Sequence, residues 1–251
     1  MLRDMGYSLP NERVEVRKTV DSYKLFGGRI VDQMPVLLAE GRSPLWTARF
    51  MRRRIDHSDT LPDLKGYSHT DFVAYDLSSR GNNIKFVLAV DKNGRVTEQG
   101  RKVFELVNPT APLVGGLLKL DGEIYDSLPG IAVPRMALRV LDRDLKEDEI
   151  LDSKLWRILA RHPDEVPSEF AEERDLLKKY ACWVKGRTKC DNNMGIYLNG
   201  SSNFAKLGAL CVGGLGGRSG LDGGDDLGIG NGRLVGYLVP EAHTSDGVTS
   251  S

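Results

Sequence analysis

The chain has 251 residues, of which 40% are hydrophobic and 28% are charged, and its 35 basic residues balance its 35 acidic ones. This is the composition of a soluble globular protein, and it excludes general disorder. The balanced charge gives no overall attraction to nucleic acid or to an anionic surface, and the apolar runs are too short for a membrane helix.

Sheet elements and one clear helix are predicted near the N-terminus. The segment 14–20 predicts a strand, and 23–31, with two glycines at its centre, predicts a β-hairpin. Ser43 and Pro44 have the character of a helix cap and a first-turn proline. The apolar positions that predict this helix recur at helical spacing and are Leu45, Ala48, Met51 and Ile55.

The middle of the chain predicts two further hairpins with a short helix between them. Residues 72–77 and 84–91 are rich in β-branched and aromatic side chains, so we expect them to pair antiparallel. A helix over about 98–107 stops at an Asn-Pro pair. The segment 113–125 resembles another hairpin, with Asp121-Gly122 at its turn.

A mainly helical segment is expected at about 134–186. Ser153 and Ser168 are placed to cap two of its helices, and Gly186 is placed to end the second one. Three strands are then predicted at 194–198, 204–213 and 233–239.

The order of these elements predicts the fold class. Strands, then helices, then strands again indicate an α+β fold with a mainly antiparallel sheet. Because sheet segments from both ends of the chain are expected to join, we predict a single domain over 1–240. The remainder, 241–251, is expected to be a loose C-terminal tail.

The glycine-rich run 213–232, GGLGGRSGLDGGDDLGIGNG, is the most unusual part of the sequence. Loops of this length are usually functional or disordered, and glycine at this density allows backbone conformations that other residues avoid. Leu215, Leu221 and Leu227 recur within the run, and a purely flexible linker has no need of them. We therefore expect an ordered surface loop held down by its leucines.

Standard motifs do not fit the glycine-rich run. Its spacing matches neither a P-loop nor a dinucleotide fingerprint, a calcium β-roll or a GxSxG serine turn. No cofactor or metal is predicted by the sequence. An enzyme or a small-ligand or cation-binding protein nevertheless stays open as an alternative. Its candidate loop site would use Arg218, Ser219, Asp222, Asp225 and Asp226.

The histidines and cysteines do not indicate catalysis. His57, His69, His162 and His243 have no motif that joins them to a nucleophile, and we expect them at the surface or at helix ends. Three cysteines form an odd set without a CxxC pair. Reduced thiols in the cytoplasm fit this pattern better than a disulfide framework.

A basic face is predicted on the first clear helix. Its candidate residues are Arg49, Arg52, Arg53 and Arg54, with Trp46 and Phe50 beside them. Such a face can bind phosphates of a nucleic acid or acidic groups of a protein, although arginines also commonly solvate the outer side of a helix. A second basic run, 178–189, has the same two interpretations.

Three motifs together resemble a group of uncharacterised archaeal proteins. The motifs are YKLFGGRIV at 23–31, SPLWTARFMRRRI at 43–55 and the glycine-rich VGGLGGRSG…GRLVG end of the chain. The resemblance implies a single soluble archaeal domain and transfers no catalytic residue.

Taken together, these features favour a non-catalytic, soluble, intracellular binding or accessory protein. Its expected partner is a macromolecule, a protein or a nucleic acid. The contact would be made by the arginine face or by the glycine-rich run.

Overall fold

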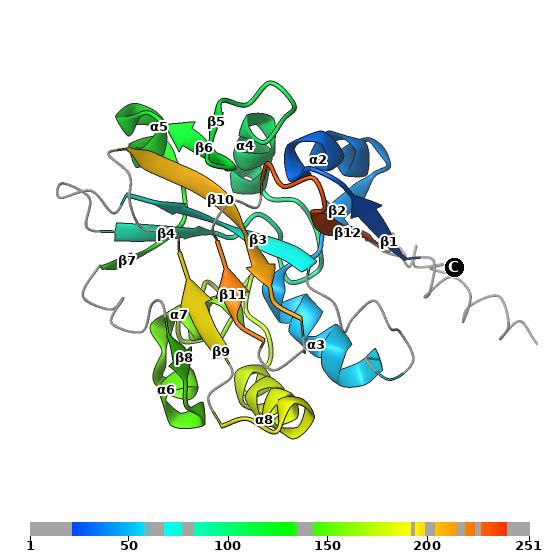
Figure 1. Ribbon diagram of the computed structural model, residues 1–251, viewed down its shortest axis with the longest axis vertical. Helices are drawn as coiled ribbons and strands as arrows, with labels where there is room; N and C mark the ends of the chain where they lie inside the picture. The colour runs from blue at the N-terminus through cyan, green and yellow to red at the C-terminus, as the bar shows by residue number, and fades with distance from the viewer. Residues whose placement is uncertain are drawn as a thin grey trace, which may run out of the picture.

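The computed structural model describes residues 22–57, 59, 68–76, 83–134, 143–191, 194–198, 204–214, 219–223 and 227–239. Within these ranges, twelve strands form one mixed, mostly antiparallel sheet (Figure 1). The strands are β1 (Tyr23–Gly27), β2 (Arg42–Pro44), β3 (Ser68–Tyr75), β4 (Asn83–Val87), β5 (Leu113–Val114), β6 (Leu117–Leu120), β7 (Ile131–Pro134), β8 (Asp144–Leu145), β9 (Met194–Tyr197), β10 (Ala205–Val212), β11 (Leu221–Asp222) and β12 (Arg233–Leu238).

The sheet joins the two ends of the described chain. Its central path runs β1-β12-β3-β10-β11-β9-β8, with parallel pairing of β12 with β3 and of β11 with β9. β1 pairs antiparallel with β12 from Tyr23 opposite Tyr237 to Gly27 opposite Arg233. The first and last of the described strands are therefore neighbours in the sheet.

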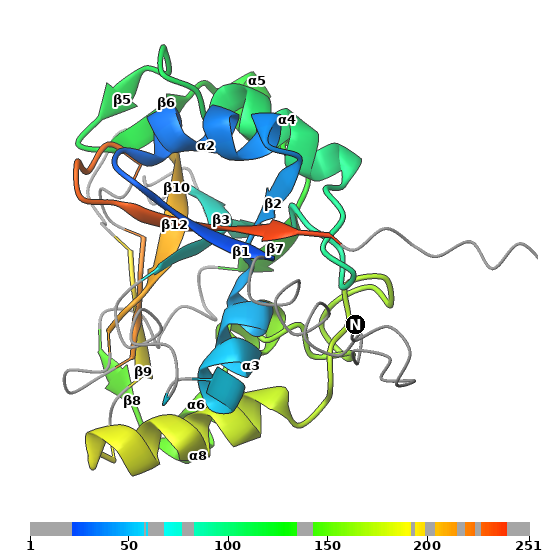
Figure 2. The same cartoon turned by 90° about the vertical axis from the view of Figure 1, so that its right-hand side faces the viewer.

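Helices cover both sides of the central strands. Figure 2 shows α2, α4 and α5 above the strands, and α3, α6 and α8 below them. In the part of the chain that the structure describes, no helix has the length and apolarity to cross a bilayer. The helices are α2 (Ile30–Ala39), α3 (Thr47–His57), α4 (Glu98–Leu106), α5 (Gly122–Ser127), α6 (Glu147–Asp152), α7 (Lys154–Leu159) and α8 (Leu176–Thr188).

One hydrophobic core contains side chains from both layers of helices and from the sheet. Trp46, Trp156 and Tyr180 are among its largest members, and each is 2% exposed or less. Burying a large apolar side chain stabilises the folded state by about 1.5–3 kcal/mol. The predicted fold class is confirmed as α+β with a mainly antiparallel sheet.

Several predicted elements are confirmed closely. β3 and β4 pair antiparallel, with Phe72 opposite Val87, and α4 lies within the predicted helix 98–107. Ser153 caps α7, because its Oγ accepts a hydrogen bond from the backbone N–H of Trp156. α6, α7 and α8 lie within or close to the predicted helical segment 134–186, whereas 135–142 falls outside the described residues, as do 14–20 and 240–251.

The predicted hairpin at 23–31 is wrong in its second strand. Arg29–Val31 leads into α2, and Ile30, Val31, Met34 and Leu37 of that helix are completely buried. β1 finds its partner in β12, at the other end of the chain. The β propensity of Ile30 and Val31 did not decide their structure, because β1 pairs with the distant strand β12 and leaves these two residues to begin α2.

The first residues of the predicted arginine helix belong to a strand. Ser43 and Pro44 form part of β2, and α3 begins at Thr47. The carboxylate of Asp71, on β3, accepts a 2.8 Å hydrogen bond from the backbone N–H of Thr47. Because this acceptor comes from another element, the local cap motif at Ser43 is not needed.

Two other boundaries also differ from the predictions. The turn of the hairpin near residue 115 is Gly115-Gly116, and Asp121 caps α5 instead, with its carboxylate accepting from the N–H of Ile124. α8 begins at Leu176, well after Ser168, and ends at Thr188 beyond Gly186. The predictions that Ser168 caps this helix and that Gly186 ends it are therefore wrong, because the N-cap is Asp175 and the C-cap is Lys189.

Candidate functional site

Residues from the two candidate sites meet in one buried contact. Arg54, at the end of α3, donates a 2.7 Å hydrogen bond from Nη1 to Ser219 Oγ and another of 2.7 Å to the hydroxyl of Tyr180 on α8. Its Nη2 donates to the backbone oxygen of Gly213 at 2.8 Å. Arg54 and Ser219 are both fully buried. A side chain of the predicted basic face therefore holds the glycine-rich run in place.

The prediction that all four arginines share an exposed face is wrong for Arg54. Its guanidinium lies 4.3 Å from the ring centre of Phe50 and is enclosed by α8 and the glycine-rich run. Arg52 pairs with Glu172 at 3.0 Å. Arg49 and Arg53 are half-buried against tyrosine rings, Arg53 over Tyr23 and Arg49 over Tyr237.

The glycine-rich run is ordered around buried leucines where the structure describes it. Leu221 and Leu227 are both 0% exposed, as the sequence predicted, and Leu215 lies outside the described residues. Leu221 also begins β11, which pairs with β10 and β9. The run is therefore more than a loop between two strands, because its middle adds a short strand to the sheet.

Backbone hydrogen bonds hold the run at several points along its length. The N–H of Gly213 donates to Gly220 O at 2.7 Å, the N–H of Gly223 donates to Tyr197 O at 2.8 Å, and Gly232 O accepts from the N–H of Gly28 at 2.9 Å. At Gly232 the two backbones approach so closely that a Cβ atom would lie 2.5 Å from Gly28 O. Glycine is required there for close packing of the chain against the start of α2.

The remaining candidate loop residues divide into an anchor and an exposed position. Ser219 is an anchor, since Arg54 and Tyr180 surround its hydroxyl, whereas Asp222 on β11 is exposed. Gly230 and Asn231 are exposed farther along the run. Arg218, Asp225 and Asp226 lie outside the described residues. Over the described ranges, no three His, Cys, Asp or Glu side chains are grouped closely enough to hold a metal ion.

A second buried polar network was not predicted from the sequence. Arg161 is completely buried in a left-handed conformation (φ 56°), and its Nη2 donates to Asp71 Oδ1 at 3.3 Å. Its guanidinium also bonds to Val90 O and lies 5.5 Å from the ring centres of Trp46 and Phe170. The signal in the sequence was the carboxylate of Asp71, which directly precedes the apolar segment FVAY. This network fastens the segment after α7 to β3.

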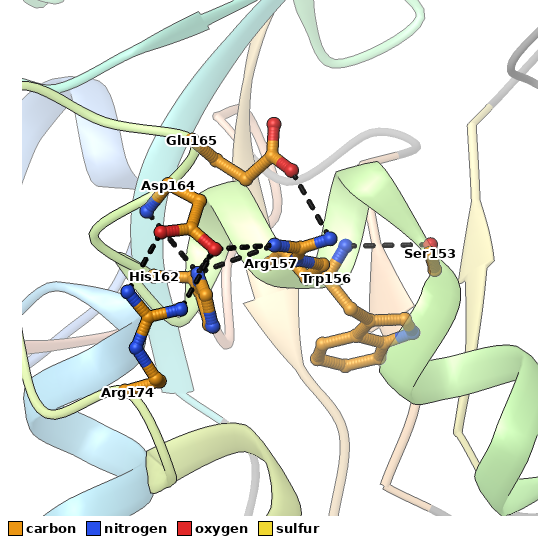
Figure 3. Close-up of polar contacts among 7 residues, drawn as sticks. All are labelled: Ser153, Trp156, Arg157, His162, Asp164, Glu165 and Arg174. Carbon is orange, nitrogen blue, oxygen red and sulfur yellow. Dashed lines mark hydrogen bonds and ion pairs between the residues drawn. The ribbon is translucent and has the colours of Figure 1, made fainter.

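Figure 3 shows a more exposed polar cluster on the same segment. Asp164 accepts bidentate hydrogen bonds of 2.8 Å from Arg174, and Arg157 lies 3.3 Å from the same carboxylate. His162 Nδ1 accepts from the N–H of Asp164 at 3.2 Å, and Arg157 lies 3.4 Å away. Burial and the positive charge of Arg157 lower the pKa of His162. These contacts fix the turn after α7.

The histidines are divided between the surface and the core. His57 is exposed in the last turn of α3, and His162 follows α7, both as predicted. The prediction is wrong for His69, which is 0% exposed on β3, with Nδ1 2.9 Å from Arg233 O. Every residue of β3 is buried, and its polar residues, His69 among them, are therefore buried too. His243 lies outside the described residues.

Comparisons with known proteins identify the fold and nothing finer. The sequence matches no family model and no curated protein. A similar solved structure comes from work on the accommodation of massive sequence variation in Nanoarchaeota by the C-type lectin fold. The two share 17% sequence identity and align with a TM-score of 0.55 over 86% of this chain and 97% of the other. The α+β architecture is thus similar to that of a C-type lectin fold.

Proposed function

We propose that the chain is a binding protein whose partner contacts the exposed side of the glycine-rich run 213–232. The contacting side chains in this proposal are Arg218, Asp222, Asp225 and Asp226. The observation that carries it is the division of the run into buried anchors and exposed positions. Ser219, Leu221 and Leu227, hereafter the anchors, are 0% exposed, while Asp222, which directly follows Leu221, is exposed.

Such a division suits a surface that must be both positioned and chemically variable. The anchors and the backbone hydrogen bonds fix the course of the chain, so a change at an exposed position costs little folding free energy. The similar structure concerns a C-type lectin fold that accommodates massive sequence variation. We infer that this chain uses the same property, with variable positions on the run and fixed positions beneath it.

The contacts of Ser219 support binding over nucleophilic catalysis. Its hydroxyl accepts from the positively charged Arg54 and lies 2.9 Å from the Tyr180 hydroxyl. A serine nucleophile needs a neighbouring base and access to substrate, and this hydroxyl is enclosed by a cation and a phenol. In the proposal Ser219 therefore positions the run, and the neighbouring charges of both signs contact a macromolecular partner.

The compartment is part of the same proposal. Cys182, Cys190 and Cys211 are free thiols, and two of them are exposed. Exposed free thiols persist in a reducing compartment, so we propose that the partner is met in the cytoplasm.

The experiment is a comparison of captured partners. The full chain is immobilised, exposed to extract of its own cells, and washed. Bound protein and nucleic acid are then quantified. The loop variant carries Arg218→Ala, Asp222→Ala, Asp225→Ala and Asp226→Ala together. We expect it to lose the partner of the parent chain while it unfolds at the same temperature.

The matched control changes two exposed charges on α4, with Glu98→Ala and Lys102→Ala. We expect this variant to capture the same partner as the parent chain. A partner retained by the loop variant would contradict the proposal.

A further inference from the structure

A second candidate site lies on the other side of α3, away from Ser219. Arg49 and Arg53 are one turn apart on that helix, and both lie against tyrosines of the β1–β12 pair. Arg53 Cζ is 3.6 Å from the ring centre of Tyr23, and Arg49 Cζ is 5.5 Å from that of Tyr237. The two rings are 5.1 Å apart. These four residues are called the arginine–tyrosine cluster below.

The two arginines of the cluster differ from their neighbour Arg52 in their ion pairs. Their neighbour Arg52 pairs with Glu172 at 3.0 Å. Among the described residues, by contrast, no carboxylate forms an ion pair with Arg49 or Arg53. Arg53 Nε is buried without a hydrogen-bond acceptor. Burial lowers the pKa of Arg53, and the nearby charge of Arg49 lowers it further. Two partly desolvated cations of the same sign are thus held together, and the carboxylate whose charge acts on Arg49, that of Glu172, is already paired with Arg52.

Hydrogen-bond donors converge on the same place. Arg49 Nε donates to the hydroxyl oxygen of Tyr23 at 3.2 Å. A phenol that accepts a hydrogen bond keeps its own proton available for donation. The Tyr23 hydroxyl and the guanidinium N–H groups that do not bond to Tyr23 can therefore act as donors to a ligand, and all three residues are half-buried.

The tyrosine rings also reduce the cost of binding. A guanidinium that already lies on an aromatic ring loses less side-chain freedom when it takes a ligand than a mobile surface arginine does. Its planar fork matches the two oxygens of a carboxylate or phosphate. Fixed forks, partial burial and the lack of an ion pair to any described carboxylate are the features expected of an oxyanion site.

We propose that Arg49, Arg53 and Tyr23 bind an oxyanion, the phosphate or carboxylate group of a small ligand. This site is separate from the glycine-rich run, because Arg54 leaves the same helix in another direction to reach Ser219. Either proposal can therefore fail without the other, and the loop variant keeps the oxyanion site.

The test is an NMR titration of the full chain with inorganic phosphate and, separately, with acetate, at ionic strength held constant by sodium chloride. We expect saturable shifts of the Arg49 and Arg53 side-chain signals. Arg53→Gln should raise the dissociation constant at least about tenfold, since it removes a charge-assisted bond. Arg53→Lys should retain part of the affinity, because it keeps the charge but not the fork. Tyr23→Phe should weaken binding less than Arg53→Gln.

The control is Arg101→Gln, at an exposed arginine of α4. It should leave the affinity unchanged. Tighter binding of phosphate than of acetate identifies a phosphate ligand, and the reverse identifies a carboxylate. Equal weakening by Arg53→Gln and Arg101→Gln, in variants with unchanged backbone spectra, would overturn the proposal. So would the absence of saturable shifts at Arg53.

Discussion

Arg54 Nη1 lies 2.7 Å from Ser219 Oγ, in a contact that joins the end of α3 to the glycine-rich run. The two residues are separated by 165 positions in the chain and are both fully buried. Through this contact the basic helix supports the run from beneath. The charge of Arg54, which the sequence suggested for binding a partner, instead positions the glycine-rich run.

Arg54→Met should destabilise the fold. The substitution keeps an apolar stem but removes the donors to Ser219, Tyr180 and Gly213. Buried acceptors that lose a charged donor cost about 1–3 kcal/mol each, so we expect a loss of about 3 kcal/mol in the free energy of unfolding. Urea unfolding measures it. Arg101→Met, at an exposed position, should change it by less than about 0.5 kcal/mol.

Two glycines of the run should respond differently to alanine. At Gly232 a Cβ would lie 2.5 Å from Gly28 O, whereas at Gly230 nothing lies within 4 Å. We expect Gly232→Ala to cost about 2 kcal/mol, because backbone must move, and Gly230→Ala to cost less than about 0.5 kcal/mol. Thermal unfolding of both variants checks this. Equal unfolding temperatures for the two variants would contradict the close approach of the backbones at Gly232 and Gly28.

The buried pair of Arg161 and Asp71 should be strongly coupled. Arg161→Met leaves the Asp71 carboxylate buried without its cation, and we expect a loss of about 3–5 kcal/mol. The double variant with Asp71→Asn removes that uncompensated charge. It should therefore be more stable than Arg161→Met alone. Strictly additive losses in this double-mutant cycle would contradict a direct interaction.

His162 should make the fold less stable as the pH falls. Its pKa is lowered from 6.5 in the folded state, chiefly by burial and then by Arg157. The unfolded chain therefore takes up the proton more readily. The contribution of neutral His162 to the free energy of unfolding is complete above pH 6.5. It is lost as the pH falls from 6.5 through the lowered pKa of the folded state.

The measurement is the free energy of unfolding from about pH 7.5 to about pH 5.5, compared with His162→Asn. This variant should lose part of the pH dependence. If the free energy of unfolding changed with pH in parallel for the two proteins, the pH dependence would belong to groups other than His162. An NMR titration of the His162 ring should also give a pKa below 6.5.

Local patterns predicted those elements whose ends are set by local residues. Thr97 and Ser153 accept hydrogen bonds from the first turns of α4 and α7, and both helices lie close to where the sequence indicates. β1 and α3 differ, because their partners are distant. β1 pairs with β12, and the N-terminus of α3 is capped by Asp71 from β3.

The candidate sites show the same limit. Leucine spacing correctly predicted burial of Leu221 and Leu227, the two leucines of the run that the structure describes. The sequence contained no sign that Arg54 would turn inward to Ser219, because that contact joins residues 165 positions apart. Asp71 could be recognised as a carboxylate before an apolar segment, but nothing in the sequence around Arg161 linked the two residues.

Site-specific photo-cross-linking tests the binding surface most directly. A photoreactive amino acid replaces exposed Asp222 in one protein and exposed Glu98 in another, and each is irradiated with the partner captured by the parent chain. We predict that the partner cross-links from position 222 and not from position 98. Cross-linking from position 98 alone, with the partner still bound to both proteins, would contradict the assignment of the glycine-rich run as the contact surface.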